Sequence, residues 1–233
     1  MIVCTICARG GSKGVKNKNL RLINGKPLIH YSVKQALDSK LFDCVAVSSD
    51  SEEILSAAKT AGAHFTIKRP DELATDTSAK LPVIQHAMKT IEEKYGKPVE
   101  YLMDLDCTSP LRNISDIKDS FKSYKSNSEA SNLITGAPAR RSPYFNLVEE
   151  NSAGFVTLAK KSTTPIVRRQ DAPKCFDMNA SIYIWRRQDL LEGKSVLGER
   201  TIIFEMPEER SLDIDSEFDF KIVELLMGER GDL

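Results

Sequence analysis

Histidine, tryptophan and cysteine are scarce in this chain: its 233 residues include three histidines, one tryptophan and five cysteines. The histidines are scattered and none adjoins a plausible nucleophile, which argues against a Ser–His or Cys–His catalytic system. An odd number of cysteines does not suggest a disulfide framework. Cys4 and Cys7 form a C-x-x-C pair, but on a strand they would point to opposite faces, and no second pair or nearby histidine completes a zinc site. We expect buried free thiols.

Net charge and long apolar runs are also missing. Lys and Arg total 33, as do Asp and Glu, so the chain lacks the overall positive charge of a general nucleic-acid binder. No segment approaches the roughly 18 apolar residues of a membrane span. The apolar run at the N-terminus is short, with no basic region before it and no cleavage site, unlike a signal peptide. We expect a cytoplasmic protein that binds neither nucleic acid nor membranes.

A glycine-rich basic loop stands out at the N-terminus. The apolar residues 2–8 predict a buried strand. The loop that follows holds three glycines and four cations: Gly10, Gly11 and Gly14, with Arg9, Lys13, Lys16 and Lys18. At the carboxyl end of a first strand, such a loop brings backbone N–H groups and positive charge to a phosphate. It is neither a P-loop nor the GxGxxG fingerprint. It predicts an anion site, best suited to a triphosphate; the alternative is an ordinary exposed turn.

Strand and helix signals alternate along most of the chain. Helices are predicted from Pro27 to about residue 40 and over 51–62, 80–94 and 115–124, and strands over 44–48, 65–67, 99–105 and 132–137. This rhythm predicts an α/β fold with a mostly parallel, doubly wound sheet. It breaks at about 139–175, where short apolar pieces suggest a β-hairpin excursion. Strands at 180–185 and 201–205 and a helix at 216–227 complete a single domain over 1–233.

Polar side chains follow several strands, at the edge of the sheet where ligands bind in such folds. They form three runs: Ser48-Ser49-Asp50, Thr75-Asp76-Thr77-Ser78, and Asp104 to Arg112. The first two runs either cap helices or donate hydroxyls to a ribose or phosphate. The third carries two carboxylates, suited to a metal or a sugar hydroxyl. Arg168-Arg169-Gln170, in the excursion, either pairs with surface acids or recognises a substrate carboxylate.

Two further carboxylates lie near the C-terminus, at Asp213 and Asp215. On a strand, side chains two residues apart share one face. Beside a triphosphate, two converging carboxylates suit Mg²⁺, which takes one or two protein carboxylates together with substrate phosphates. The alternative is that Asp215 caps the final helix.

In this order, the motifs resemble the CMP-sialic acid (acylneuraminate) cytidylyltransferase family and its CMP-nonulosonate relatives. The matching pieces span about residues 2–226: Arg9 to Gly14 with Lys18-Asn19-Leu20, Ser48-Ser49-Asp50, Arg69-Pro70 with Glu72-Leu73, Asp76-Thr77, Thr108 to Arg112, Asn179 with Ile182-Tyr183, and Asp213-Ile214-Asp215. The resemblance implies a Rossmann-like α/β domain with a small β-rich dimerisation subdomain at about 139–175, in a homodimer or a dimer of dimers. It also implies transfer of CMP from CTP to a nine-carbon 2-keto sugar acid, with Mg²⁺ as cofactor and pyrophosphate as the second product.

The resemblance assigns roles to individual residues. Nucleotide binding is implied for Ala8, Arg9, Gly10, Gly11, Ser12, Lys18, Asn19, Arg69, Asp76, Thr77 and Ser78. Sugar binding is implied for Asp106, Ser109, Arg112, Arg169, Asn179 and Ala180, with Arg169 reaching into the site of the partner subunit. Arg9, Lys18 and Asp215 are implied as catalytic, and Asp213 and Asp215 as the magnesium ligands.

Two departures from the family pattern bear on the sugar. Members that act on N-acetylneuraminate carry glutamine where this chain has Asp106, and lysine where it has Phe145. A carboxylate lacks the N–H donors of an amide, so we expect N,N'-diacetyllegionaminate to be favoured over N-acetylneuraminate. The alternatives are a CMP-Kdo synthetase and, from another class, a non-catalytic nucleotide-binding protein. A dehydrogenase is disfavoured because the dinucleotide fingerprint is missing.

Overall fold

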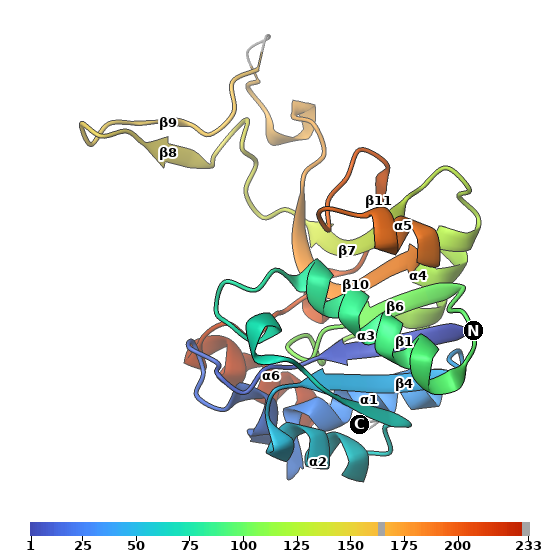
Figure 1. Ribbon diagram of the computed structural model, residues 1–233. Coiled ribbons are helices and arrows are strands. Elements are labelled where there is room, and N and C mark those ends of the chain that lie inside the picture. The colour runs from blue at the N-terminus through green and yellow to red at the C-terminus, as the bar shows by residue number, and fades with distance from the viewer. Residues whose placement is uncertain (163–165, 230–233) are drawn as a thin grey trace.

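The computed structural model describes residues 1–162 and 166–229 and shows a seven-stranded sheet covered by helices (Figure 1). The strands follow the order β11-β7-β10-β6-β1-β4-β5 across the sheet. Their bounds are β1 (Ile2–Cys7), β4 (Cys44–Ser49), β5 (Phe65–Lys68), β6 (Tyr101–Leu105), β7 (Asn132–Pro138), β10 (Phe176–Arg186) and β11 (Thr201–Glu205). β10 runs antiparallel to β6 and β7, whereas the other adjacent pairs of this sheet are parallel. The predicted α/β fold with a mostly parallel sheet is confirmed.

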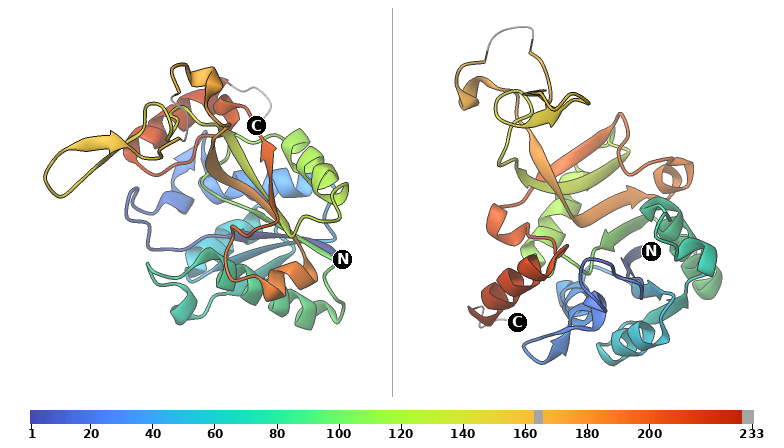
Figure 2. Two further views of the ribbon diagram at one scale, coloured as in Figure 1. Left: turned by 90° about the horizontal axis from the view of Figure 1, so that it is seen from above. Right: turned by 90° about the vertical axis from the view of Figure 1, so that its left-hand side faces the viewer.

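Helices cover both faces of the sheet (Figures 1 and 2). One face carries α3 (Lys80–Tyr95) and α5 (Arg187–Glu192); the other carries α1 (Leu28–Ser39), α2 (Glu52–Thr60), α4 (Ile114–Lys125) and α6 (Glu217–Glu229). Strand side chains alternate between the faces: Val3 packs on the α3 side, whereas Cys4 and Ile6 pack on the α1 side. Each fully buried aliphatic side chain of this kind contributes about 1.5–3 kcal/mol to folding.

Local sequence signals set the ends of the helices next to the ligand edge. Ser51 caps α2, because its Oγ accepts a hydrogen bond from Ile54 N at 3.3 Å. Asn113 and Asp116 form a capping box at the start of α4. In Figure 1, β1 and β4 point left, so their carboxyl ends and the loop after β1 lie on that side of the molecule.

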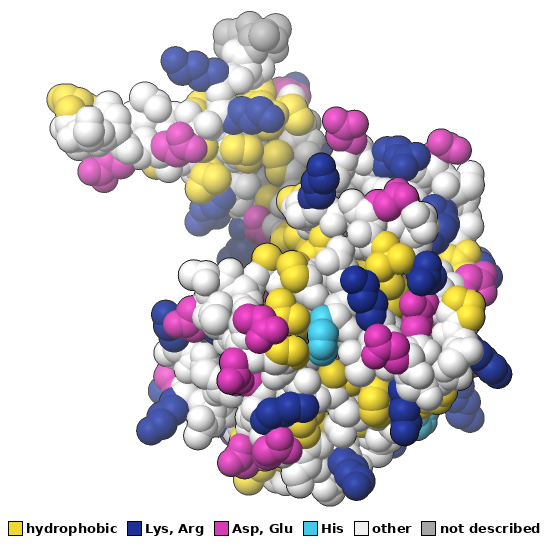
Figure 3. Space-filling view, viewed as in Figure 1, with side chains coloured by type: hydrophobic (Ala, Val, Ile, Leu, Met, Phe, Trp, Pro, Cys, Tyr) yellow, Lys and Arg dark blue, Asp and Glu magenta, His cyan; other side chains and the backbone are white. Residues whose placement is uncertain are grey.

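Residues 139–162 and 166–175 leave the body of the domain as an arm (Figures 1 and 2). Its tip is a hairpin of β8 (Val148–Glu150) and β9 (Val156–Leu158), which confirms the predicted β-hairpin excursion. Large apolar side chains on the arm are exposed: Phe145, Leu147, Val148, Phe155, Val156, Leu158 and Val167. Hydrophobic side chains are visible on the surface of the arm in Figure 3. Exposed apolar side chains gathered on one segment are typical of a contact surface. Its use in dimerisation stays a prediction.

Short elements complete the described chain. They are a small sheet of β2 (Leu22–Ile23) and β3 (Lys26–Pro27), and the 3-10 turns η1 (Lys18–Leu20), η2 (Asp71–Leu73), η3 (Arg169–Asp171) and η4 (Glu208–Arg210). Among the described helices, none is long and apolar enough to cross a bilayer. The five cysteines are free and at least partly buried, as expected.

Candidate active site

The basic loop and the two C-terminal aspartates meet at the carboxyl end of β1, although they come from opposite ends of the chain. Gly14 packs against the backbone of Asp215: a β-carbon on Gly14 would stand 2.0 Å from Asp215 O. No side chain fits in that space, so this close approach requires glycine. The contact brings the cations of the loop and the carboxylates to one place.

Two hydrogen bonds fix the backbone of Ile214 within this junction. Ile214 N donates to Thr108 O at 3.0 Å, and Lys18 Nζ donates to Ile214 O. Lys18 Nζ also lies 3.8 Å from Asp215 Oδ1. Lys18 is therefore held beside the carboxylates, where its ammonium group can stabilise negative charge that develops on a phosphate.

The segment that carries Asp213 and Asp215 is not a strand, so the argument that the two share a strand face is wrong. The backbone there pairs with Thr108 and Lys18 instead of a neighbouring strand. Asp215 does not cap α6 either. Ser216 occupies the cap: its Oγ accepts from Asp219 N at 3.2 Å, and its N–H donates to Asp219 Oδ2 at 2.8 Å.

Asp213 is the group in this site best suited to a cation. Its Oδ1 is buried and has no hydrogen-bond partner in the part of the chain that the structure describes. Burial, followed by the charges of Asp106 and Asp215, raises the pKa of Asp213 to about 6. A nearby divalent cation would relieve both effects. Among the described residues, no group of three or more His, Cys, Asp or Glu is already arranged as a metal site, so substrate oxygens would have to complete one.

Asp76 bridges two cations of the basic loop. Its Oδ1 lies 2.7 Å from Arg9 Nη1, and its Oδ2 lies 2.5 Å from Lys13 Nζ. The hydrogen bond from Lys13, with the charges of both cations, lowers the pKa of Asp76. Thr77 and Ser78 follow in the same turn, where both hydroxyls hydrogen-bond Thr75. The two loops predicted to bind the nucleotide are thus joined.

Two polar side chains, those of Asp50 and Asn19, hold the backbone of the basic loop. Gly10 N donates to Asp50 Oδ1 at 2.9 Å, and Asn19 Nδ2 donates to Arg9 O at 3.0 Å. Asp50 therefore fixes the loop instead of capping a helix. Gly11 has open space around its α-carbon.

Ala8 and Arg69, both predicted to bind the nucleotide, are joined through Ser48. Ala8 N donates to Ser48 O at 3.0 Å, and Arg69 Nη2 donates to the same oxygen at 2.9 Å. Both residues are buried. They hold the end of β1 against β4; direct contact with CTP stays a prediction for them.

A cavity of about 230 Å³ opens at this junction. It is lined by Cys7, Arg9, Ser12, Lys13, Gly14, Lys18, Asn19, Asp106, Cys107, Thr108 and Asp215. The lining includes all three residues predicted as catalytic, together with Ser12 and Asn19 from the nucleotide set and Asp106 from the sugar set. The structure thus brings the core of the predicted site together.

Two other predicted sugar-binding residues, Arg112 and Ser109, are buried and are not in the lining of this cavity. The guanidinium of Arg112 is 1% exposed and donates to Ser181 O, Asp106 O and Ser32 Oγ. Ser109 Oγ donates to Asn179 O at 3.1 Å. These contacts hold both side chains within the protein, although the buried Nε of Arg112 has no hydrogen-bond partner among the described residues. Their contact with a sugar stays a prediction.

Asn179 and Ala180 sit in a bulge of β10, where its register with β7 shifts between Met178 and Tyr183. Ala180 has a φ of 53°, a left-handed conformation that is uncommon for alanine. Asn179 is buried, and its Oδ1 accepts from Thr135 Oγ1 at 2.7 Å. Bulges of this kind re-aim side chains next to active sites.

Lys80 belongs to the site but was not indicated by the sequence. Its Nζ lies 2.6 Å from Asp106 Oδ2 and 3.2 Å from Asp104 Oδ2. Burial alone would raise the pKa of Asp106, but the charge and hydrogen bond of Lys80, with two hydrogen bonds from Thr108, lower it to about 2. The lysine at the start of a helix resembles a solvent-exposed residue in the sequence, and only the fold places it beside two carboxylates.

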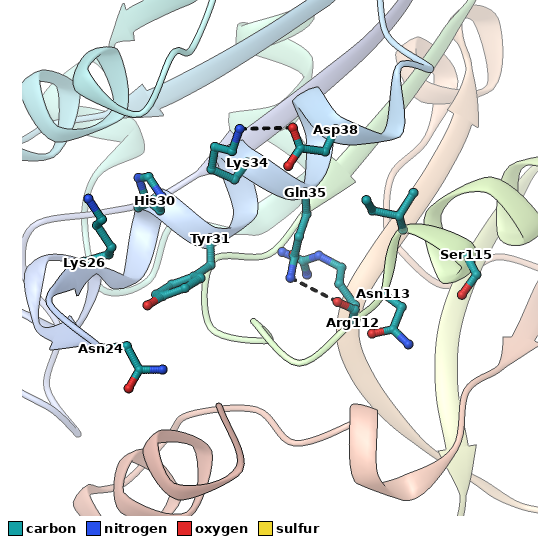
Figure 4. Close-up of a pocket in the computed structure, with 11 residues that line it drawn as sticks. Asn24, Lys26, His30, Tyr31, Lys34, Gln35, Asp38, Arg112, Asn113 and Ser115 are labelled. Carbon is teal, nitrogen blue, oxygen red and sulfur yellow. Dashed lines mark hydrogen bonds and ion pairs between the residues drawn. The ribbon is translucent and has the colours of Figure 1, made fainter. Parts of the chain in front are cut away.

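The side chain of Arg169 lies outside the part of the chain that the structure describes, so its predicted role in trans stays a prediction. A larger cavity, of about 590 Å³, lies between α1, the β2–β3 hairpin and the start of α4 (Figure 4). Lys34 and Asp38 pair there along α1, and Gln35 donates to Arg112 O. Of the predicted site residues, Arg112 is the one that lines this larger cavity. The larger cavity is therefore not the predicted active site.

Known proteins are similar to this chain in sequence and in fold. The profile of the cytidylyltransferase family matches residues 3–220. A Campylobacter coli protein named post-translational flagellin modification protein B is 49% identical over 98% of this chain and 96% of its own length. A Campylobacter jejuni CMP-N,N'-diacetyllegionaminic acid synthase is 53% identical over 97% of this chain and 94% of its own. A solved CMP:2-keto-3-deoxy-manno-octonic acid synthetase complexed with CTP superposes with a TM-score of 0.70 over 98% of both chains, at 18% identity. That last likeness concerns the fold alone.

Proposed function

The chain belongs to the cytidylyltransferase family and is a nucleotidyltransferase, and we propose that it activates a nine-carbon 2-keto sugar acid with CTP, giving a CMP-sugar and pyrophosphate. The observation that carries the proposal is the contact of Gly14 with Asp215, which joins a triphosphate-type loop to carboxylates at one cavity. N,N'-diacetyllegionaminate is favoured over N-acetylneuraminate. The name of the Campylobacter jejuni relative and the carboxylate at Asp106 support that choice.

The proposed chemistry asks the protein to position reactants and to neutralise charge. The anomeric hydroxyl of the sugar acid attacks the α-phosphorus of CTP in line, and pyrophosphate leaves as the bond to the β-phosphate oxygen breaks. Arg9 and Lys18 line the cavity with their positive charges and stabilise the phosphates as charge develops. Ser12 also lines the cavity and supplies its hydroxyl to the same phosphates.

Mg²⁺ is part of the proposal, with Asp213 and Asp215 as its protein ligands. The unpartnered buried oxygen of Asp213 and the proximity of Asp215 to the basic loop fit a hard cation that also takes phosphate oxygens. When bound, the ion would supply Lewis-acid polarisation of the α-phosphate. Lys18, beside Asp215, would then adjoin both the metal ligands and the phosphates.

The proposal also includes a homodimer, or a dimer of dimers, and a cytoplasmic location where CTP is available. The exposed apolar side chains of the arm support the dimer, because a second copy of the chain would cover them. The arm is also the segment that carries Arg169, which the proposal places at the carboxylate of the sugar acid in the partner's site.

Pyrophosphate release tests the proposal and separates the alternatives. The purified chain is mixed with CTP and Mg²⁺ and with one of four acids: N,N'-diacetyllegionaminate, N-acetylneuraminate, diacetylpseudaminate or Kdo. Release with legionaminate well above the others is the expected result, and it should disappear with EDTA. Preference for Kdo would favour a CMP-Kdo synthetase. Tight CTP binding without release for any acid would favour a non-catalytic nucleotide-binding protein.

A further inference from the structure

Lys80, at the first position of α3, has its ammonium group beside two carboxylates and an aromatic ring. Its Nζ lies 2.6 Å from Asp106 Oδ2 and 3.2 Å from Asp104 Oδ2. It also lies 4.4 Å from the centroid of the Tyr183 ring, a favourable cation–π distance. The Tyr183 ring is itself buried and stacked on Trp185, at 5.8 Å between centroids. Lys80 therefore has a single, well-defined position.

The two carboxylates that Lys80 joins differ in their access to the cavity. Asp104 is fully buried in β6, and its Oδ1 accepts a hydrogen bond from Thr5 Oγ1 at 2.7 Å. Asp106 lies at the end of the same strand, lines the cavity and keeps 20% of its side chain exposed. Asp104 thus anchors the lysine from inside the sheet, whereas Asp106 presents the pair to the cavity.

Asp106 retains room for one further hydrogen-bond donor. A carboxylate has about four acceptor positions on its two oxygens. Donors among the described residues use three of these positions: Thr108 N and Thr108 Oγ1 donate to Oδ1 at 3.1 and 2.9 Å, and Lys80 donates to Oδ2. The backbone of Asp106 is held as well, because Arg112 Nη2 donates to its carbonyl oxygen. The remaining acceptor position of the Asp106 carboxylate is available to a donor in the cavity, because Asp106 lines it.

We propose that Lys80 is a positioning residue: it fixes Asp106, for which sugar binding is already expected, as an ionised acceptor for a hydroxyl or amide N–H of the sugar acid. This inference rests on the proposed function and names how the same site selects its second substrate. An ionised carboxylate accepts hydrogen bonds and cannot donate them. The pair therefore selects acids that present a donor at this point, and it acts on the acid without touching CTP.

Removing Lys80 alone would leave buried Asp104 without its counter-charge, so a paired variant is needed. In K80M/D104N the ammonium is lost together with the buried charge it balances, while Asp106 keeps its carboxylate. D104N alone is the matched control, because it leaves the contact of Lys80 with Asp106 in place. D106N is the second probe, since Lys80 then stays paired with Asp104.

The test measures KM for the sugar acid and KM for CTP, by pyrophosphate release, in these variants and in K80M/D104N/D106N. We expect KM for the acid to rise about ten- to hundredfold in K80M/D104N and in D106N, the range of one hydrogen bond to a charged group, with KM for CTP unchanged. D104N alone should lower the melting temperature and raise KM for the acid less than K80M/D104N does, because the contact of Lys80 with Asp106 stays. The triple variant should be no worse than D106N, because Lys80 acts through Asp106.

Three results would overturn this role for Lys80. They are an unchanged KM for the acid in K80M/D104N, a parallel rise of both KM values, and a further rise in the triple variant over D106N. Failure of the proposed function has a different signature, because the parent chain would then release no pyrophosphate with any of the four acids. That result would overturn the sugar-acid contact as well.

Discussion

Gly14 and Asp215 are in backbone contact: a β-carbon at position 14 would stand 2.0 Å from the carbonyl oxygen of Asp215. The glycine-rich loop and the segment that carries Asp213 and Asp215 can come together only because position 14 has no side chain. This contact sets the distance between the cations that would hold a triphosphate and the carboxylates that would hold its metal ion.

Gly14→Ala should therefore move the basic loop away from the segment that carries Asp213 and Asp215. We expect kcat/KM for CTP to fall about a hundredfold or more, the cost of misplacing reacting groups by about 1 Å, while the sheet stays folded. Gly228→Ala is the matched control, because a β-carbon built there meets no other described segment of the chain within 4 Å. Steady-state kinetics and circular dichroism on both variants check the prediction. Equal activities of the two variants would contradict it.

Lys18→Met should lower kcat without unfolding the protein. The Lys18 ammonium is held by Ile214 O beside Asp215, where it would stabilise charge on the transferred phosphate. We expect a loss of about 10²–10³ in kcat, by analogy with removal of one oxyanion donor. Lys59→Met, on the exposed surface of α2, is the control. A decrease of less than a few fold in kcat for Lys18→Met would rule out this role.

Asp213→Asn should stabilise the metal-free protein at high pH. The folded-state pKa of Asp213, about 6, lies above its ordinary value of 3.8, so the folded state holds the proton more tightly than the unfolded state. Ionisation of this carboxyl therefore costs stability progressively as the pH rises through about 4 to 6. The neutral variant should gain up to about 3 kcal/mol at pH 8 and nothing near pH 3.

Urea unfolding of the parent and of Asp213→Asn at both pH values, in EDTA, measures that difference. Added Mg²⁺ should stabilise the parent at pH 8 and leave the variant unaffected, because binding to the folded state alone raises its stability. A difference in stability between the parent and the variant that is the same at pH 3 and pH 8 would show that burial does not disfavour the ionised form of Asp213.

Phe155→Asp should dissociate the proposed dimer. Phe155 lies on the hairpin of the arm and is 71% exposed, and a charge there would be buried against the second copy. Leu225→Asp is a matched control, since Leu225 is equally exposed but lies on α6 in the body of the domain. Light scattering should give a dimer for the parent and for the control and a monomer for Phe155→Asp. The same mass for all three would exclude the arm as the interface.

Local patterns in the sequence were sufficient for the fold class and for most of its elements, but not for the strand order or the antiparallel direction of β10. The apolar run of β11 was predicted with its observed bounds, Thr201–Glu205, and the loss of the strand–helix rhythm located the arm. The basic loop was recognised because its glycines and cations are adjacent in the chain. These features depend on neighbouring residues, so the order of residues is enough to predict them.

Contacts between distant segments were not predictable in the same way. The sequence placed Asp213 and Asp215 on a strand, but hydrogen bonds from Ile214 to Thr108 and Lys18 set that backbone instead. Lys80 resembles a surface residue until the fold places it against Asp104 and Asp106. Such partners are separated along the chain, and only the packed structure shows which charges face one another.

Phosphorus NMR of the reaction mixture is the most direct test of cytidylyl transfer. The chain is incubated with CTP, Mg²⁺ and N,N'-diacetyllegionaminate, and the phosphorus-containing products are followed over time. We predict that the resonances of CTP are replaced by one phosphodiester and by pyrophosphate in equal amounts, because the α-phosphorus stays with the sugar. Persistent CTP, or its hydrolysis to CMP or CDP without a phosphodiester, would contradict this function.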